Sequence, residues 1–146
     1  MLVKQGDRTL LEARAKAEPA ADVMTRDCPT VDGWLNVQNF VEQELLRTGQ
    51  RFFFVRDKGE IAGVVTPHEV KEIDRAKWPF VTLQSVMRPL NDLRTVTPDA
   101  TLINALESMG RHDLNQLPVI ANGHLKGVLS RGQVINYLRT HAELRG

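Results

Sequence analysis

The stretch Gly63-Val64-Val65-Thr66 recurs 64 residues later as Gly127-Val128-Leu129-Ser130. Two further landmarks repeat in the same order, at offsets of 63 and 65 residues: Val23-Met24 returns as Val86-Met87, and Thr30-Val31 returns as Thr95-Val96. Three ordered landmarks at nearly constant offsets are not expected by chance. The chain therefore contains an internal repeat, whose copies each bury a surface that neither can cover alone.

Each copy has an apolar pattern with the period of a helix, followed by two short apolar runs joined by a turn. In the first copy the pattern predicts a strand near 30–31, a helix over 35–47, strands over 51–56 and 60–65, and a helix over 67–75. The second copy repeats this order, with a short strand near 95–96 and a closing helix over 131–143 that turns Val134, Ile135 and Leu138 inward. Asp57-Lys58-Gly59 and Ala121-Asn122-Gly123 predict the hairpin turns, because glycine adopts a positive φ at little cost.

We therefore predict a mixed α/β (α+β) fold made of two βαββα repeats. The first repeat covers 21–76, a connector covers 77–82, and the second repeat covers 83–146. Residues 1–20 form an N-terminal segment, in which 8–18 are predicted to form an amphipathic helix; in the connector, Pro79 biases Trp78 away from helical angles. Because about 60 residues cannot cover an apolar sheet face, the two repeats are expected to pack sheet to sheet with pseudo-two-fold symmetry.

The composition excludes several classes of function. The 146 residues include 19 basic and 18 acidic side chains, a formal charge of +1, so we expect no nucleic-acid partner. The single cysteine, Cys28, fits a reducing compartment, and the four histidines show no metal-ligand spacing. No apolar run approaches the roughly 18 residues of a membrane span, and charges begin at Lys4 where a signal peptide is apolar. We expect a cytoplasmic location, including the cytosolic side of a membrane protein.

The repeated motifs resemble those of a tandem pair of CBS domains, the Bateman module, over residues 21–139. The second copy carries the fuller set, which comprises Val86-Met87, Thr95-Val96, Pro98, Thr101-Leu102, Ala105-Leu106, Leu117-Pro118-Val119-Ile120 and Gly127-Val128-Leu129-Ser130. The first copy departs from it, with Gly33 and Phe53 where the pattern has proline. The resemblance implies a regulatory module whose central cleft holds up to two nucleotides, commonly adenine nucleotides, and which commonly dimerises.

A narrower resemblance is to the cytosolic CBS tail of site-2-type intramembrane metalloproteases. It rests on Arg75 to Pro79, Val86 to Leu90, Asp92 to Val96, Asn115 to Val119 and Ser130 to Gly132. The protease signature H-E-x-x-H is absent from the sequence. The resemblance implies an excised tail or a stand-alone relative, with a membrane metalloprotease domain or another regulated protein as the partner.

In this family the last strand of each repeat ends in [ST]-x-x-D, in which the hydroxyl binds phosphate and the aspartate holds the ribose diol. Here the two copies have Thr66 with Glu69, and Ser130 with Gln133. Glu69 can still accept two hydroxyl donors, whereas the uncharged Gln133 makes weaker hydrogen bonds. The alternative is structural: both pairs are also capping boxes that begin a helix, and such a cap contributes about 1 kcal/mol with no ligand present.

The remaining candidate positions are polar or β-branched. Arg131 lies beside Ser130 at a predicted helix N-terminus, which favours phosphate, although a solvated surface charge is the alternative. The uncharged Asn115 and Gln116 argue against tight binding of a di- or triphosphate. The resemblance adds two Thr-Val pairs, so the predicted ligand-binding residues are Thr30, Val31, Thr66, Glu69, Thr95, Val96, Asn115, Gln116, Ser130, Arg131 and Gln133.

We interpret the chain as a non-enzymatic regulatory module that is expected to form a homodimer. It requires no cofactor, and it is predicted to bind AMP, ADP, ATP or S-adenosylmethionine weakly in the cleft between the repeats, with phosphate near Arg131. No nucleophile motif or phosphate-binding glycine-rich loop supports an enzyme. The alternative function is a ligand-free interaction and dimerisation module of a site-2-type membrane metalloprotease or a stand-alone relative.

Overall fold

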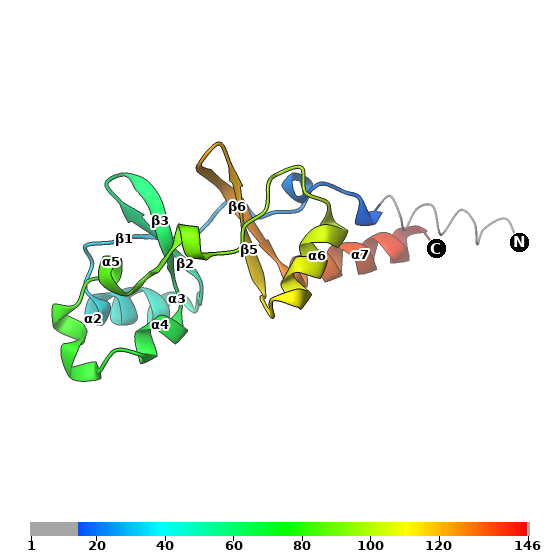
Figure 1. The fold of residues 1–146 in the computed structure, drawn as a ribbon. Coiled ribbons are helices and arrows are strands. Elements are labelled where there is room, and N and C mark those ends of the chain that lie inside the picture. Colours follow the sequence, from blue (N-terminus) through cyan, green and yellow to red (C-terminus); the bar gives the residue numbers. More distant parts are fainter. Residues whose placement is uncertain (1–14, 146) are drawn as a thin grey trace, which may run out of the picture. The chain divides into compact units, whose positions relative to one another are not determined.

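A computed structural model describes residues 15–145, and the chain divides into two compact units (Figure 1). The continuous unit is the single stretch Cys28–Leu93. The split unit joins residues 15–27 to residues 94–145. The units do not begin where the sequence repeats begin, since Val23-Met24 lies in the split unit and Val86-Met87 in the continuous unit.

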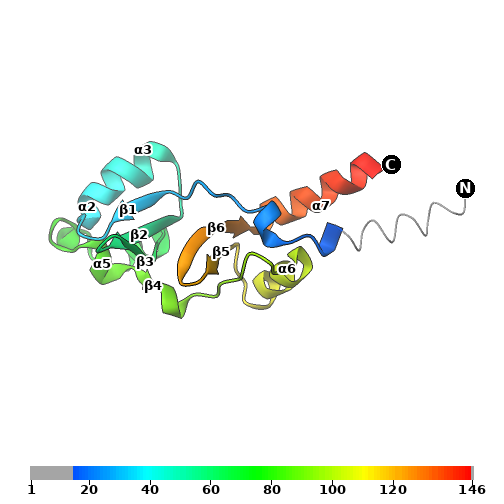
Figure 2. The same cartoon turned by 90° about the horizontal axis from the view of Figure 1, so that it is seen from above.

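The continuous unit is a four-stranded sheet, in the order β1-β2-β3-β4, with helices packed against it (Figure 2). Strand β1 pairs parallel with β2, and the other neighbouring strands pair antiparallel. The elements are β1 (Thr30–Asp32), α2 (Val37–Phe40), the π-helical η2 (Val41–Leu45), α3 (Leu46–Thr48), β2 (Phe53–Asp57), β3 (Glu60–Val65), α4 (Pro67–Lys71), the 3-10 helix η3 (Arg75–Phe80), α5 (Leu83–Val86), β4 (Arg88–Pro89) and η4 (Leu90–Asp92). The predicted order of strands and helices in the first copy is confirmed, although α4 ends at Lys71 rather than at residue 75.

The core of the continuous unit forms where the first helix meets the sheet. Phe40 of α2 and Phe53 of β2 are buried and pack edge to face, with ring centroids 5.1 Å apart. Val31 and Val55 are paired across β1 and β2 and belong to the same buried cluster. The alternation of β2 therefore places Phe53 and Val55 on the face that the helix covers.

The split unit contains one hairpin, with helices on either side of it in the chain. Its elements are η1 (Ala20–Asp22), α6 (Leu102–Arg111), β5 (Gln116–Ala121), β6 (His124–Ser130) and α7 (Arg131–Arg145). The predicted short strand near 95–96 is reduced to a single parallel bridge, from Val96 to Val119. A turn at Pro98 follows almost at once and leaves no room for a longer strand.

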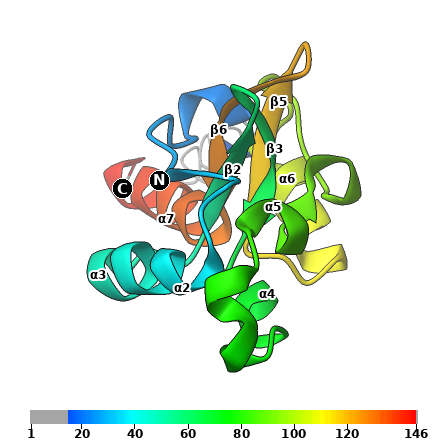
Figure 3. The ribbon, with the colours of Figure 1, turned by 90° about the vertical axis from the view of Figure 1, so that its left-hand side faces the viewer.

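The strands of two hairpins, β2–β3 and β5–β6, are labelled in Figure 3. Each hairpin turns on a pair of residues with positive φ. The φ angles are 53° and 82° for Lys58 and Gly59, and 54° and 77° for Asn122 and Gly123. Two consecutive positive φ angles match the twist of the flanking strands. The glycines were predicted, whereas the positive φ of Lys58 was not.

The two repeated methionines pack against the two repeated glycines: Met24 lies against Gly127, and Met87 lies against Gly63. A Cβ built on Gly127 would lie 2.7 Å from the Thr25 carbonyl oxygen and 2.8 Å from Met24 Sδ. A Cβ on Gly63 would clash with the carbonyl oxygen of Arg88. Each glycine therefore lets a backbone approach the strand more closely than any side chain would allow.

Two predictions about exposed and irregular segments need correction. Ile135 was predicted to face inward but is 38% exposed, because the buried face of α7 runs through Val134 and Leu138 and Ile135 lies off it. Pro79 was predicted to bias Trp78 away from helical angles, but both residues lie within the 3-10 helix η3, where the Trp78 indole N–H donates to the carbonyl oxygen of Ile73 at 3.0 Å. The predicted helix over 8–18 lies mostly outside the described residues.

Candidate functional site

The first candidate site is a cavity of about 660 Å³ in the continuous unit. Helix α4, the turn after it, helix α5 and strand β4 supply its walls, which comprise His68, Glu69, Glu72, Ile73, Ser85, Val86 and Arg88. A cavity of this volume lies within the range of roughly 300 to 1,000 Å³ that holds small molecules. Ile73 and Val86 are apolar and the other lining residues are polar or charged, so the cavity can hold a ligand that has both kinds of surface.

Glu69 is the buried charged residue of this cavity, with 8% of its surface exposed. Its Oε1 accepts hydrogen bonds from the backbone N–H of Thr66 at 2.7 Å and from the Thr66 hydroxyl at 2.8 Å. The Thr66 hydroxyl oxygen in turn accepts from the N–H of His68 at 3.1 Å. The capping box therefore forms as the structural alternative predicted, and among the described residues no donor reaches Oε2 of Glu69.

The charges of this cavity are not paired with one another. The only ion pair within 4.0 Å among the side chains of residues 15–144 joins Arg56 to Asp32, so Arg88 is not paired with Glu69 or Glu72. Glu72 and Arg88 are both exposed. The cavity thus presents separated charges of both signs to any molecule that enters it.

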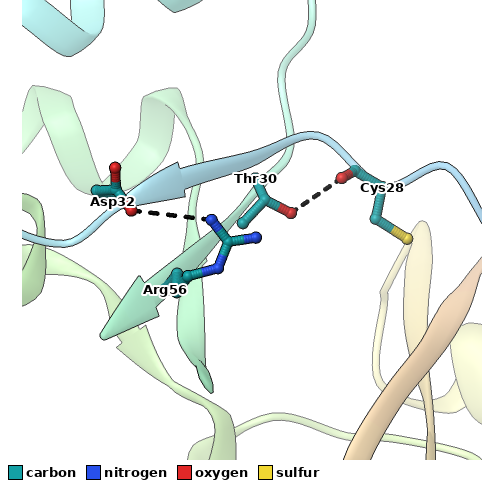
Figure 4. A network of polar contacts seen from close by, with 4 residues as sticks. All are labelled: Cys28, Thr30, Asp32 and Arg56. Carbon is teal, nitrogen blue, oxygen red and sulfur yellow. Dashed lines mark hydrogen bonds and ion pairs between the residues drawn. The ribbon is translucent and has the colours of Figure 1, made fainter. Parts of the chain in front are cut away.

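A smaller cavity of about 210 Å³ lies along β1 in the same unit and is lined by Thr30, Val31, Asp32, Trp34, Leu35, Gln43, Glu44 and Arg56. The hydroxyl of Thr30 donates to the carbonyl oxygen of Cys28 at 2.9 Å, and Arg56 pairs with Asp32 at 3.8 Å (Figure 4). Val31 is buried in the core. The first-copy candidates are therefore divided, with Thr30 and Val31 on one cavity and Glu69 on the other.

The second-copy candidates come together at the end of the β5–β6 hairpin where β5 begins. Gln116 is paired with Ser130, and the N–H of Arg131 donates to the carbonyl oxygen of Asn115 at 2.8 Å. Val96 joins them from the other side of β5, where its N–H donates to the carbonyl oxygen of Pro118 at 3.0 Å, and Thr95 precedes it as an exposed residue. The side chain of Arg131 is exposed.

Gln133 uses both ends of its amide within the split unit. Its Oε1 accepts from the backbone N–H of Ser130 at 3.0 Å. The backbone N–H of Gln133 donates to the Ser130 hydroxyl oxygen at 3.1 Å. Its Nε2 donates to the hydroxyl of Thr25. Gln133 therefore caps α7 and also connects it by a hydrogen bond to Thr25, in the segment that precedes β1.

Glu69 is the one lining residue of the larger cavity that the sequence predicted as a site residue. The six others were not predicted: His68, Glu72, Ile73, Ser85, Val86 and Arg88. Two of them had a local signal. Glu72 follows Glu69 by three residues, which is one helical turn, and Arg88 directly follows the landmark Val86-Met87.

No group of three or more metal-binding side chains occurs in the part of the chain that the structure describes. Within the same residues, no helix combines the length and the apolar character that crossing a membrane requires.

An acidic pair in the split unit provides a test of its electrostatics. A hydrogen bond to the Asp22 side chain, burial and the charge of Asp22 raise the pKa of Glu18 above its ordinary value, and His141 and the Tyr137 hydroxyl oppose the rise. The folded chain therefore binds this proton more tightly than the unfolded chain does. The free energy of unfolding should fall as the pH rises through the raised pKa.

Replacing Glu18 with glutamine should remove this fall. We expect Glu18→Gln to match the wild type near pH 4, within error, and to become more stable toward pH 7, by less than about 1 kcal/mol because the pair is close to solvent. Thermal unfolding measured in steps between these pH values checks this. Glu107→Gln, at an exposed position of α6, is the control, and equal pH dependence of the wild type and Glu18→Gln would contradict the expectation.

Comparison with known proteins gives a family match for part of the chain and a fold for most of it. Residues 83–140 match the family model of the CBS domain. The chain is 23% identical over 135 residues to sll0528 of Synechocystis sp., a protein named as a zinc metalloprotease, and the match covers 90% of this chain but 36% of that protein. The chain thus spans about a third of the length of this relative.

Two solved structures show the same fold along most of the chain. The CBS domain of the bacterial CNNM/CorC family Mg²⁺ transporter, in complex with ATP, matches with a TM-score of 0.75 at 13% identity, over 93% of this chain and 97% of that one. The CBS domain pair of MJ0100, in complex with 5′-methylthioadenosine and S-adenosyl-L-methionine, matches with a TM-score of 0.67 at 12% identity, over 85% of this chain and 98% of that one. At these identities the comparison establishes the fold and leaves the ligand to the chemistry of the site.

Proposed function

Because residues 83–140 are a CBS domain and the chain has the fold of a CBS domain pair, we propose that it is a regulatory module that binds an adenine nucleoside or nucleotide. Two structural neighbours are complexes with adenine-containing ligands, ATP in one and methylthioadenosine with S-adenosylmethionine in the other. The role proposed for this chain is binding without catalysis. Its proposed site is the cavity beside Glu69.

The position of Glu69 on the wall of the cavity carries this proposal. Its Oε1 is used by the capping box, whereas Oε2 has no donor among the described residues. A ribose hydroxyl is a donor that this buried carboxylate oxygen can accept, and hydrogen bonds to an ionised acceptor are roughly twice as strong as neutral ones. Capping and ribose binding are therefore compatible at this residue, because each uses a different oxygen.

Calorimetric titration of adenosine, AMP and ATP into the wild type and two variants tests the site. Glu69→Gln retains an oxygen for the capping box but loses the charge, so we expect adenosine to bind about tenfold more weakly, with little change in thermal stability. Arg131→Ala serves as the comparison, because the sequence alone placed the phosphate near Arg131 in the split unit.

The variants separate two locations for the ligand. A loss of affinity in Arg131→Ala with none in Glu69→Gln would move the site to the split unit. No heat from any of the three ligands at millimolar concentration would reject adenine nucleotide binding altogether.

A bound ligand would regulate through a difference in affinity between two conformations of the module. Such a ligand shifts the conformational equilibrium only as far as it binds one state better than the other. That shift in conformation would change the activity of the attached or partner protein. The expected homodimer stays a prediction that sedimentation velocity can check, and the cytoplasmic location likewise stays a prediction.

A second candidate function is favoured by the similarity to sll0528. In this proposal the chain is an interaction module for a site-2-type membrane metalloprotease and needs no ligand. The test is to remove from sll0528 the stretch that this chain matches, and to add the chain to the detergent-solubilised remainder. Co-elution in size-exclusion chromatography is the expected result, and separate elution at micromolar concentrations would reject a direct interaction.

A further inference from the structure

The charges on the cavity wall select among adenosine derivatives, an inference that rests on the proposed function. Two carboxylates, Glu69 and Glu72, face the cavity together with one guanidinium, that of Arg88. These three side chains together carry a formal excess of one negative charge. A phosphate group carries about two negative charges at neutral pH, so a nucleotide would bring its charge toward two carboxylates and one compensating arginine.

The separation of these charges makes the selection more specific. Since Arg88 forms no ion pair with either glutamate, the wall has an anionic position and a cationic position that are each open to a ligand. Glu72 makes no ion pair or side-chain hydrogen bond with any described residue, and it is exposed at the end of α4. A ligand that carries a cation and a carboxylate on one short chain would satisfy both positions at once.

We propose that the cavity prefers adenosine derivatives with a zwitterionic, cation-bearing tail over adenosine phosphates, and that Glu72 determines this preference. Glu69 accepts the ribose hydroxyls, as the proposed function states. Glu72 attracts the cation of the tail, and Arg88 attracts its carboxylate. The preference is electrostatic, so it should weaken as the salt concentration rises.

Calorimetry with four probes tests the inference: adenosine, S-adenosylmethionine, AMP and ATP. For the wild type at low salt we expect S-adenosylmethionine to bind about tenfold more tightly than AMP, with adenosine between them and ATP weakest. Glu72→Gln should bring S-adenosylmethionine and AMP within about threefold of each other. Glu72→Lys should reverse their order.

Glu60→Gln is the matched control, because Glu60 is an exposed carboxylate of the same unit that lies outside the cavity lining. It should leave all four affinities unchanged. Circular dichroism should show that the exposed Glu72 variants fold as the wild type does.

The outcomes distinguish this inference from the function on which it rests. If adenosine binds and AMP or ATP binds more tightly than S-adenosylmethionine, the preference is overturned and the proposed function stands. The preference also fails if Glu72→Gln leaves the ratio of affinities unchanged. If none of the four probes binds, the proposed function and this inference are both rejected.

Discussion

Replacing Gly127 with alanine should lower the free energy of unfolding by about 1 to 3 kcal/mol, the usual cost of inserting a methyl group where there is no room. The added Cβ would lie 2.7 Å from the Thr25 carbonyl oxygen, which accepts a hydrogen bond from the N–H of Val128 at 2.9 Å. Backbone cannot yield as the tip of a flexible side chain can. The segment around Thr25 must therefore move away from β6, which weakens the hydrogen bond from Gln133 to Thr25.

Thermal unfolding of Gly127→Ala measures this cost, and for a chain of this size the loss corresponds to a fall in Tm of about 2 to 12 °C. The control is Gly132→Ala in the same unit. Gly132 lies in α7, and a Cβ there would meet nothing within 4 Å. Since alanine favours a helix over glycine and Gly132 lies in the first turn of α7, the control should lose no stability and gain at most about 0.5 kcal/mol. Equal stability of the two variants would show that β6 and the segment around Thr25 are not in close contact.

Replacing Phe40 with alanine should cost about 3 to 5 kcal/mol, the range for removing a buried aromatic side chain. Phe40 is fully buried, and its ring packs edge to face on Phe53. The vacated volume lies between α2 and the sheet, where the strand pairing of β1 and β2 limits collapse. The loss should appear in chemical denaturation as a lower midpoint.

The control for this prediction is Phe80→Ala, which removes the same side chain from a position that is 85% exposed. Its effect should stay within about 0.5 kcal/mol, as for most surface substitutions. A cost at Phe80 similar to that at Phe40 would mean that Phe80 is covered in solution.

The local elements could be predicted because each has a short-range physical cause. The apolar period predicted the helix that contains Val37 and Phe40, and the Asn122-Gly123 pair predicted the second hairpin. The resemblance to a CBS domain pair was confirmed by the family match of residues 83–140 and by the fold. These features depend on residues that are neighbours in the sequence.

Each methionine packs against the glycine of the other sequence copy, and this pairing could not be predicted in the same way. Met24 lies near the start of the first sequence copy, yet it packs against Gly127 of the second, and Met87 packs against Gly63 of the first. The repeat showed that methionine and glycine recur together, but both pairings within a copy and pairings between copies fit that pattern. Only the close approach of the backbones decides between them.

The candidate site was predicted only in part, for a related reason. Glu69 was predicted because it belongs to a motif. Glu72 and Arg88 line the same cavity only because the fold brings the end of α4 and strand β4 together. The sequence also offered Thr30 and Glu69 as members of one site, and the structure places them on two cavities. Which side chains share a wall depends on tertiary packing, which no local motif records.

The arrangement of the two units also bears on how the chain acquires its structure. One unit is an unbroken stretch inserted within the other, so its contacts can form while the outer segments are still apart. The outer unit must bring residues before 28 to residues after 93, and an unstructured intervening chain makes that closure entropically costly. Prior formation of the inserted unit would shorten the effective loop, and the topology therefore favours an assembly sequence that proceeds from the inside outward.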